Sequence, residues 1–405
     1  LLFLFLFIFN FKIMIYLFLM LMMFLLVKNY YMGMFFLSMN NFFIFLIFMS
    51  ILILLLIFLT ELNYNLKLLS FFLIFISLIF FVSLNIFYIY IFFELSLFPI
   101  MIMILGYGYQ IEKINSSYYL FFFTLICSMP FFFFIFNLDL VKSMNYFNLF
   151  FSWELSLVIS LMFLLKFPVY FLHYWLPKAH VEAPTTASML LAGLLLKMGT
   201  GGLLRFLYSF NFYFLGVYFF ISFIGMILSN FNCIIQSDLK ALAAFSSINH
   251  MSFVLLSMVF LNKISLISSV IIMFSHGLIS TLMFFFIGEF YHYANNRLIY
   301  YYSSVFLNSL FFCLLVSLTW LYNGGVPFSL SFFSEFMSFV ILFNYNLFYM
   351  FFGSLYFFIS FYYCLFFISV NFVGKNYFKI NLNLNSFTSF FIICNSNIFF
   401  FIFLI

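Results

Sequence analysis

The stretch Pro177-Lys178-Ala179-His180-Val181-Glu182-Ala183-Pro184-Thr185-Thr186-Ala187-Ser188 is a short polar island between long apolar runs, and Leu194-Leu195-Leu196-Lys197-Met198-Gly199 follows it. The first part is charged and contains two prolines, so it is unsuited to hydrocarbon. The second part places a lysine inside a new apolar helix. An ionisable side chain at membrane depth is costly and by default marks an ion or proton path. The sequence therefore predicts a membrane protein with a functional charge in its interior.

The composition of the whole chain supports a membrane protein. Of the 405 residues, 68% are hydrophobic and 6% are charged, whereas soluble chains carry about 25% charged residues. A helix that crosses a bilayer needs roughly 20 apolar residues. The candidate spans are 1–27, 34–59, 68–84, 86–106, 117–136, 148–167, 185–208, 211–230, 239–260, 264–290, 301–322, 326–345, 347–370 and 387–405. Because some neighbours could merge, we expect an all-α polytopic transmembrane helical bundle of about 12–14 helices.

Several classes of function lack their sequence signals. The net charge of +5 is spread thinly, so no basic cluster predicts a nucleic-acid partner. The five cysteines are widely spaced and include no CxxC pair, which argues against an iron–sulfur or structural zinc site. Neither a GxGxxG fingerprint nor a Walker motif is present. We therefore expect no cofactor and no metal in this chain.

The abundance of phenylalanine indicates a cellular location. The chain contains 79 phenylalanines, more than packing requires. Codons rich in A and T would produce this bias, and an animal mitochondrial genome fits it best. We therefore expect a multi-pass protein of the mitochondrial inner membrane that needs no targeting peptide.

Five ionisable residues are the candidate site. Glu94, Lys197, His276 and Glu335 lie within apolar spans, and Lys240 lies at the polar edge of another span. Each has a structural alternative: the acids could be neutral and hydrogen-bonded to a neighbouring helix, Lys197 could form a structural ion pair, and Lys240 could belong to an interfacial loop. His276 could be a hydrogen-bonded core residue, although imidazole exchanges protons near physiological pH.

Position along the helices favours a functional interpretation for two of these residues. Lys197 lies 13 residues after Pro184, roughly 20 Å along a helix, which is near the middle of the membrane. A desolvated ammonium releases its proton more readily. Glu335 follows Gly324-Gly325-Val326-Pro327, a sequence that favours a broken helix. Broken helices beside an ionisable residue are typical of transporter sites.

The segment from Lys166 to Glu182 is the most polar part of the chain. Tyr170, Tyr174 and Trp175 are residue types that gather at membrane interfaces. We therefore expect this segment to lie near a membrane surface before the next span begins.

Six sequence motifs are spread roughly from Glu94 to Glu335. They are His173-Tyr174-Trp175-Leu176-Pro177-Lys178-Ala179-His180-Val181-Glu182-Ala183-Pro184, Leu194-Leu195-Leu196-Lys197-Met198-Gly199, Phe93-Glu94-x-Ser96-Leu97-x-Pro99, Ser237-Asp238-Leu239-Lys240-Ala241-Leu242, Phe245-Ser246-Ser247-Ile248-Asn249-His250-Met251 and Ser275-His276-Gly277-Leu278. Together these motifs resemble the subunit 4 family of mitochondrial NADH:ubiquinone oxidoreductase, or respiratory complex I.

The resemblance implies an antiporter-like membrane-arm subunit built on inverted repeats with broken helices. It places Glu94, Lys197, Lys240, His276 and Glu335 on a proton path. It also implies that the chain carries this path and no redox centre, while NAD, FMN, iron–sulfur clusters and ubiquinone bind elsewhere in the complex. The implied partners are the other membrane-arm subunits and the lipid bilayer.

The same resemblance implies how the chain is divided. We expect a single transmembrane domain over 1–405 that begins about one helix later than longer members. Its parts are N-terminal helices over 1–84, a first repeat over 85–230, a second repeat over 231–370 and a C-terminal helix over 371–405.

A mechanism follows as a hypothesis. Glu94 and Lys197 would form a switchable pair, and Lys197 would pass its proton through Lys240 and His276 to Glu335 when the pair separates. Moving two unit charges from about 4 to 8 Å apart changes their interaction by about 2 kcal/mol at an effective dielectric near 20. One alternative is a stand-alone cation/proton antiporter. Another is an inert membrane scaffold, in which neutral substitutions at the buried charges would be harmless.

Overall fold

The structure is a computed structural model that describes residues 39–83, 85–137, 152–207, 212–303, 310–345 and 347–373. Within these ranges the secondary structure is helical, apart from one isolated β-bridge between Asp238 and Leu298. The predicted all-α transmembrane bundle is therefore confirmed. The expected spans 1–27 and 387–405 lie outside the described residues.

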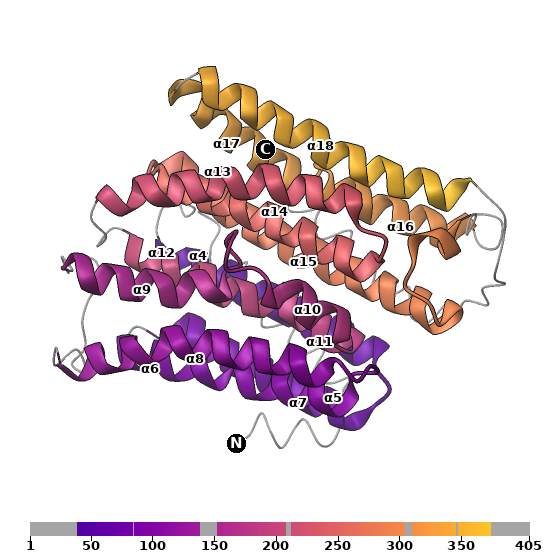
Figure 1. Ribbon diagram of the computed structural model, residues 1–405, viewed down its shortest axis with the longest axis horizontal. Coiled ribbons are helices and arrows are strands. Elements are labelled where there is room, and N and C mark those ends of the chain that lie inside the picture. Colours follow the sequence, from indigo (N-terminus) through magenta and orange to yellow (C-terminus); the bar gives the residue numbers. More distant parts are fainter. Residues whose placement is uncertain are drawn as a thin grey trace, which may run out of the picture.

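The first helices form one side of the bundle, shown in indigo and purple (Figure 1). They are α4 (Met39–Thr60), α5 (Tyr64–Val82), α6 (Ile86–Leu95), α7 (Leu97–Tyr107) and α8 (Lys113–Asn137). Helices α6 and α7 meet at Ser96 and together make one span. Pro99 does not interrupt α7, because it lies in the first turn of the helix, where a missing N–H is tolerated.

The next elements cross the middle of the bundle. They are α9 (Trp153–Lys166), α10 (Trp175–Glu182), α11 (Thr185–Leu190), the π-helix η2 (Leu191–Leu195) and α12 (Leu196–Phe206). The last three form one continuous span over Thr185–Phe206, which is buried along its whole length. A buried span can hold a charged side chain only if protein groups surround that charge.

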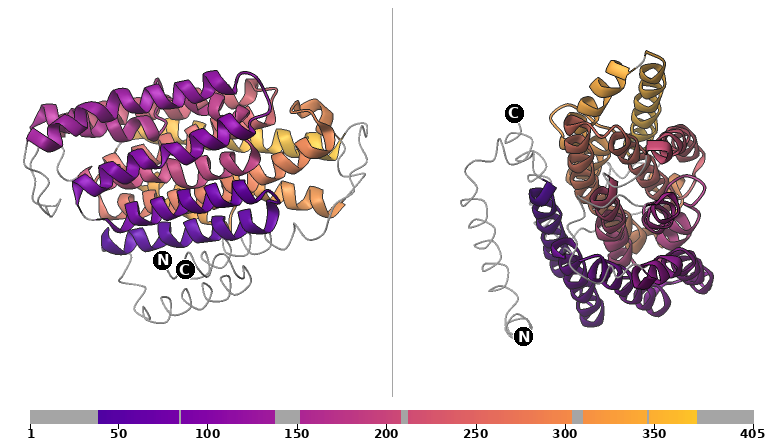
Figure 2. Two further views of the ribbon diagram at one scale, coloured as in Figure 1. Left: turned by 90° about the horizontal axis from the view of Figure 1, so that it is seen from below. Right: turned by 90° about the vertical axis from the view of Figure 1, so that its left-hand side faces the viewer.

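The remaining helices complete the opposite side. They are α13 (Phe212–Ile235), α14 (Leu239–Val259), α15 (Lys263–Ala294), the 3-10 helix η4 (Ile299–Tyr302), α16 (Leu310–Asn323), α17 (Leu330–Tyr345) and α18 (Leu347–Phe372). Helix α15 is the central element, because it packs against α4, α11, η2, α14, α16 and α17. The end-on view shows the helices running side by side through the bundle (Figure 2).

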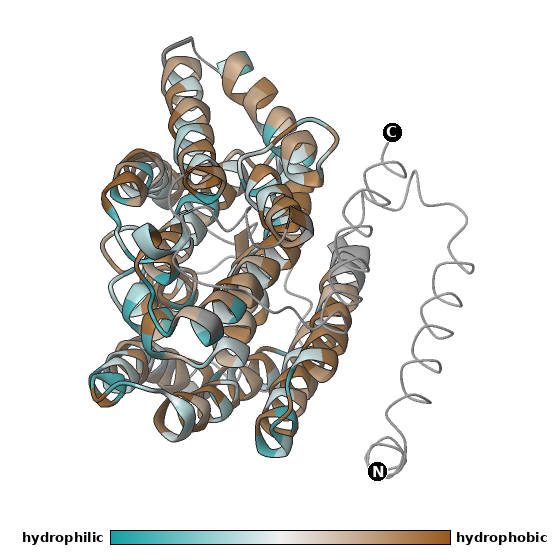
Figure 3. Cartoon of the chain, turned by 90° about the vertical axis from the view of Figure 1, so that its right-hand side faces the viewer, coloured by the Kyte–Doolittle hydropathy of each residue, from teal (hydrophilic) through white to brown (hydrophobic). Residues whose placement is uncertain are grey.

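The outer surface suits a lipid environment. Within the described ranges, eight helices are long and apolar enough to cross a membrane. Only 39% of the α13 span and 33% of the α18 span are buried, and apolar side chains such as Phe220 and Phe358 lie on the outside. The brown colour of hydrophobic residues runs along the helices of the bundle (Figure 3). The protein is therefore a multi-pass membrane protein.

Two helices of the bundle are broken. Residues 324–329 separate α16 from α17, which confirms the break expected at Gly324-Gly325-Val326-Pro327. Residues 167–174 separate α9 from α10. Each break contains a phenylalanine with positive φ, Phe171 at 80° and Phe328 at 72°. Such a conformation is rare outside glycine and is held only by its surroundings.

The break between α9 and α10 lies in the segment predicted to be near a membrane surface, and most of its polar side chains are enclosed by protein. Lys166, Trp175 and His180 are each 0–1% exposed, although Tyr174 does face outward. The indole N–H of Trp175 donates to the Leu165 carbonyl at 2.9 Å and so ties the two ends of the break together. Non-helical backbone is tolerated at membrane depth where protein encloses it. The polar residues of this segment therefore lie mainly inside the bundle.

Candidate functional site

Lys197 and His276 form the centre of a row of buried ionisable side chains. Lys197 Nζ lies 2.8 Å from His276 Nδ1 and donates to the Ala192 carbonyl at 2.6 Å. Both side chains are almost fully buried. Ala192 belongs to the π-helix η2, whose wider turn differs from the hydrogen-bonding pattern of an α-helix. The backbone next to Lys197 thus offers its ammonium a carbonyl acceptor.

Gly277 packs closely against Lys197 and Met49, next to the Lys197–His276 pair. A Cβ built at Gly277 would lie 3.3 Å from Lys197 Cε and would collide with Met49 Sδ. A side chain at this position would therefore push against the stem of Lys197. Gly277 explains how α15, which packs against η2, comes close enough for His276 to reach the lysine.

The row continues from His276 to Glu335. The rings of His276 and His250 are 5.5 Å apart, and His250 Nδ1 lies 3.4 Å from Glu335 Oε1. The Tyr356 hydroxyl lies 3.2 Å from His250 Nδ1 and donates to Glu335 Oε1 at 3.4 Å. A cavity of about 10 Å³ lies among these groups, close to the minimum volume that holds one water molecule.

The broken helix positions Glu335. Gly325 has a φ of +70°, and a Cβ built there would lie 2.5 Å from Glu335 Oε2. The left-handed backbone and the close approach of the carboxylate both require glycine. The sequence signal of paired glycines before Glu335 therefore has a structural cause.

Glu94 lies beside Lys166, which the sequence interpretation missed. Lys166 Nζ donates to the Phe93 carbonyl and to Ser96 Oγ, the latter at 3.2 Å, and the charge of Glu94 acts on it. Glu94 Oε1 is buried and has no hydrogen-bond partner within the described part of the chain. The Lys197 ammonium instead contacts Ala192 and His276, and the lysine on which the charge of Glu94 acts is Lys166, so the pairing of Glu94 with Lys197 stays a prediction.

Lys240 is buried and helical. It lies in the first turn of α14 with 2% exposure, and its ammonium donates to the Ala183 carbonyl at 2.8 Å. The alternative of a solvated loop residue therefore does not hold. Ala183 lies between α10 and α11, so Lys240 joins α14 to the connection between these two helices.

The charges of Lys240 and Lys197 both act on His180. Its ring stacks on Phe284 at 4.5 Å, and neither ring nitrogen has a hydrogen-bond partner among the described residues. A buried polar group without a hydrogen-bond partner is uncommon, and a functional role is one explanation for it. His180 therefore belongs to the same row.

The row unites four of the five predicted residues and adds others. Lys197, His276 and Glu335 are linked through the intervening His250, while Lys240 is related to the row by the charge that it and Lys197 both exert on His180. Glu94 lies with Lys166 in a second group. Gly199 brings the two groups near each other, since a Cβ there would lie 2.8 Å from Phe167 N, next to Lys166.

The missed residues had recognisable signals. Lys166 ends the run Leu164-Leu165-Lys166, which repeats the pattern Leu195-Leu196-Lys197. His250 lies in a motif that carried the family resemblance but received no role. The described residues contain no cluster of three His, Cys, Asp or Glu side chains that could hold a metal ion. The chemistry that this arrangement supports is transfer of protons between bases and acids at short range.

Comparisons with known proteins agree with this geometry. The family described as "NADH:quinone oxidoreductase/Mrp antiporter, TM" matches residues 83–361. A relative from Caenorhabditis elegans named "NADH-ubiquinone oxidoreductase chain 4" is 55% identical over 279 residues, which cover 68% of this chain and 68% of the relative. A relative of the same name from Ascaris suum is 52% identical and covers 67% of each chain.

The fold also has a counterpart among solved structures. A chain of respiratory complex I from Thermus thermophilus with bound NADH superposes with a TM-score of 0.79 at 19% identity, covering 89% of this chain and 79% of that one. This likeness concerns the fold, since the identity is low. The match of the family over residues 83–361, together with the two relatives, shows that the chain belongs to the NADH:quinone oxidoreductase/Mrp antiporter transmembrane family.

Proposed function

We infer that this chain is a proton-translocating membrane-arm subunit of respiratory complex I, which couples NADH oxidation and ubiquinone reduction to proton pumping. The observation that carries the proposal is the connected row Lys197–His276–His250–Glu335, which crosses four helices inside the bundle. The names of the two nematode relatives support the assignment to complex I. The chain contributes the proton path to the enzyme.

The proton path begins at the Glu94 and Lys166 group. While the carboxylate is near, Lys166 holds its proton. When the pair separates, the proton moves towards Lys197, because a desolvated ammonium without a counter-charge is unfavourable.

Lys197 passes the proton along the row. His276 accepts it at Nδ1, and His250 and Glu335 receive it next, with the small cavity providing room for one bridging water. Lys240 and His180 form a branch at the connection between α10 and α11. Each of these groups changes protonation state without leaving the bundle.

The two broken helices support the proposed inverted repeats. One break, at 167–174, falls in the proposed first repeat over 85–230, and the other, at 324–329, falls in the second repeat over 231–370. Each break adjoins an ionisable residue, Lys166 in one repeat and Glu335 in the other. This correspondence is typical of transporters built from paired halves.

The proposal includes a location and partners. The chain resides in the mitochondrial inner membrane and assembles with the other membrane-arm subunits. NAD, FMN, iron–sulfur clusters and ubiquinone bind in other parts of the complex. The exposed faces of α13 and α18 contact lipid or these partners.

A native gel of mildly solubilised source membranes tests the assignment. The gel is stained for NADH dehydrogenase activity, and its bands are identified by mass spectrometry. Peptides of this chain are expected in the large active band. A stand-alone cation/proton antiporter would instead run at low mass without that activity, and this result would refute the complex I assignment.

A further inference from the structure

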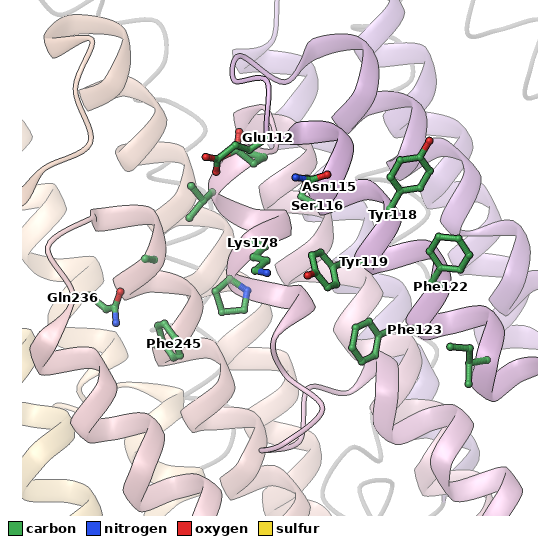
Figure 4. Close-up of a pocket in the computed structure, with 15 residues that line it drawn as sticks. Glu112, Asn115, Ser116, Tyr118, Tyr119, Phe122, Phe123, Lys178, Gln236 and Phe245 are labelled. Carbon is green, nitrogen blue, oxygen red and sulfur yellow. The ribbon is translucent and has the colours of Figure 1, made fainter.

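A groove of about 880 Å³ opens on the surface where α8, α10 and α14 meet (Figure 4). Helix α8 lines the groove with Asn115, Tyr119, Phe122 and Phe123, and α10 lines it with Lys178. This volume lies within the range of pockets that hold a whole ligand, about 300–1,000 Å³. None of the side chains of the proposed proton path lines the groove, although helix α10 contributes residues to both. The groove is therefore a separate site.

The length and polarity of the groove match one leaflet of a bilayer. Its α8 wall extends from Asn115 to Ile126, about 17 Å at 1.5 Å per residue, and Glu112 lies just before the helix begins. Half of a hydrocarbon core of about 30 Å plus a headgroup covers a similar distance. Polar residues lie towards the start of α8, next to the loop, and aromatic and aliphatic residues lie further along the helix.

Two charges in the groove are available to a ligand. The Lys178 ammonium is exposed and lies 3.9 Å from the centre of the Tyr119 ring. Glu112 is exposed nearer the loop end. Neither forms an ion pair with another described residue. The third charge, Glu182, already faces Arg297 at 3.9 Å.

We propose that this groove binds a zwitterionic glycerophospholipid such as phosphatidylethanolamine. The phosphate lies against Lys178, the amine points outward to Glu112, and an acyl chain follows Phe122, Phe123 and Ile126. The order of the charges, positive deeper and negative towards the loop, is the complement of such a headgroup. The carboxylates of Glu112 and Glu182 disfavour a lipid whose headgroup carries only negative charge.

The bound lipid has a structural consequence for α10. Lys178 lies on the face of α10 that lines the groove, whereas His180 of the same helix is fully buried against Phe284. A lipid in the groove therefore supports from outside a helix that carries a member of the buried row. The proposal does not depend on which reaction the row performs.

Photo-crosslinking tests the site in the intact assembly purified from membranes. The assembly is incorporated into nanodiscs with a phosphatidylethanolamine that carries a photoreactive acyl chain, and labelled residues are mapped by mass spectrometry. The label is expected on residues 113–137 of α8. Lys178→Gln is expected to reduce this labelling at least threefold, while Lys263→Gln, an exposed lysine on α15, leaves it unchanged.

A second variant tests the headgroup. With the native chain, phosphatidylethanolamine is expected to label the groove more than phosphatidylglycerol does, and Glu112→Gln is expected to remove that preference. Labelling that Lys178→Gln leaves unchanged would overturn the proposal. A cross-link from the groove to a segment of another subunit, or stronger labelling of the native groove by phosphatidylglycerol, would overturn it as well.

Discussion

Lys197 Nζ lies 2.8 Å from Nδ1 of His276, although 79 positions separate the two residues in the sequence. The partner of this buried lysine is thus a base that can be neutral, and not a carboxylate. A proton shared between an ammonium and an imidazole can move without separating opposite charges. This relationship supports the proposal that Lys197 is a relay and that the switchable pair is formed by Glu94 and Lys166.

The Tyr356 hydroxyl is expected to matter for the end of the path. Tyr356→Phe removes only the oxygen that lies 3.2 Å from His250 and 3.4 Å from Glu335. A hydrogen bond to a charged group contributes about 1.5 kcal/mol, which corresponds to about tenfold in rate. The coupled proton-pumping rate should therefore fall about tenfold while the complex assembles. Tyr362→Phe, at an exposed position of the same helix, is the control, and equal effects of the two variants would contradict the role of Tyr356.

Glu94 and Lys166 are expected to act as a unit. Glu94→Gln and Lys166→Met should each reduce proton pumping by nearly as much as the double variant, because either change leaves the other group without its counter-charge. The coupling energy should be on the order of 2 kcal/mol. Pumping by membrane vesicles, measured for all three variants, gives this value. Purely additive effects would show that the two residues work independently.

Gly325→Ala is expected to displace the Glu335 carboxylate. An alanine at a φ of +70° is strained by about 1–2 kcal/mol, and its Cβ would lie 2.5 Å from Glu335 Oε2. Both the thermal stability of the assembly and its pumping should decrease. Gly106→Ala, where a Cβ meets no atom within 4 Å, is the matched control. If both substitutions are tolerated equally, the fit of Gly325 to the carboxylate is unimportant.

Much of the fold was predictable because hydrocarbon imposes strict requirements on the chain. Long apolar runs predict spanning helices, and the paired glycines before Glu335 predict a break that the structure contains. Lys197 could be placed deep in the membrane from its distance to Pro184. The division into two repeats stays a prediction that the paired breaks support.

The surroundings of Lys166 could not be predicted in the same way. Tyr170, Tyr174 and Trp175 suit a membrane interface, but the same residues also suit a break enclosed by neighbouring helices. The choice depends on how α9 and α10 pack against α8, α12 and α14, which no local pattern contains. The partner of Glu94 depends on the same packing, since the two lysines follow nearly identical runs of leucine.

The most direct test of the proposed path is the ratio of protons pumped to electrons transferred in the Lys197→Met variant. This substitution removes the ammonium and keeps an unbranched apolar side chain, so the assembly and NADH oxidation should persist. Lys263→Met, at an exposed position, serves as the control. We expect the ratio to fall in Lys197→Met and to remain normal in Lys263→Met. A normal ratio in an assembled Lys197→Met complex would contradict the proposed path.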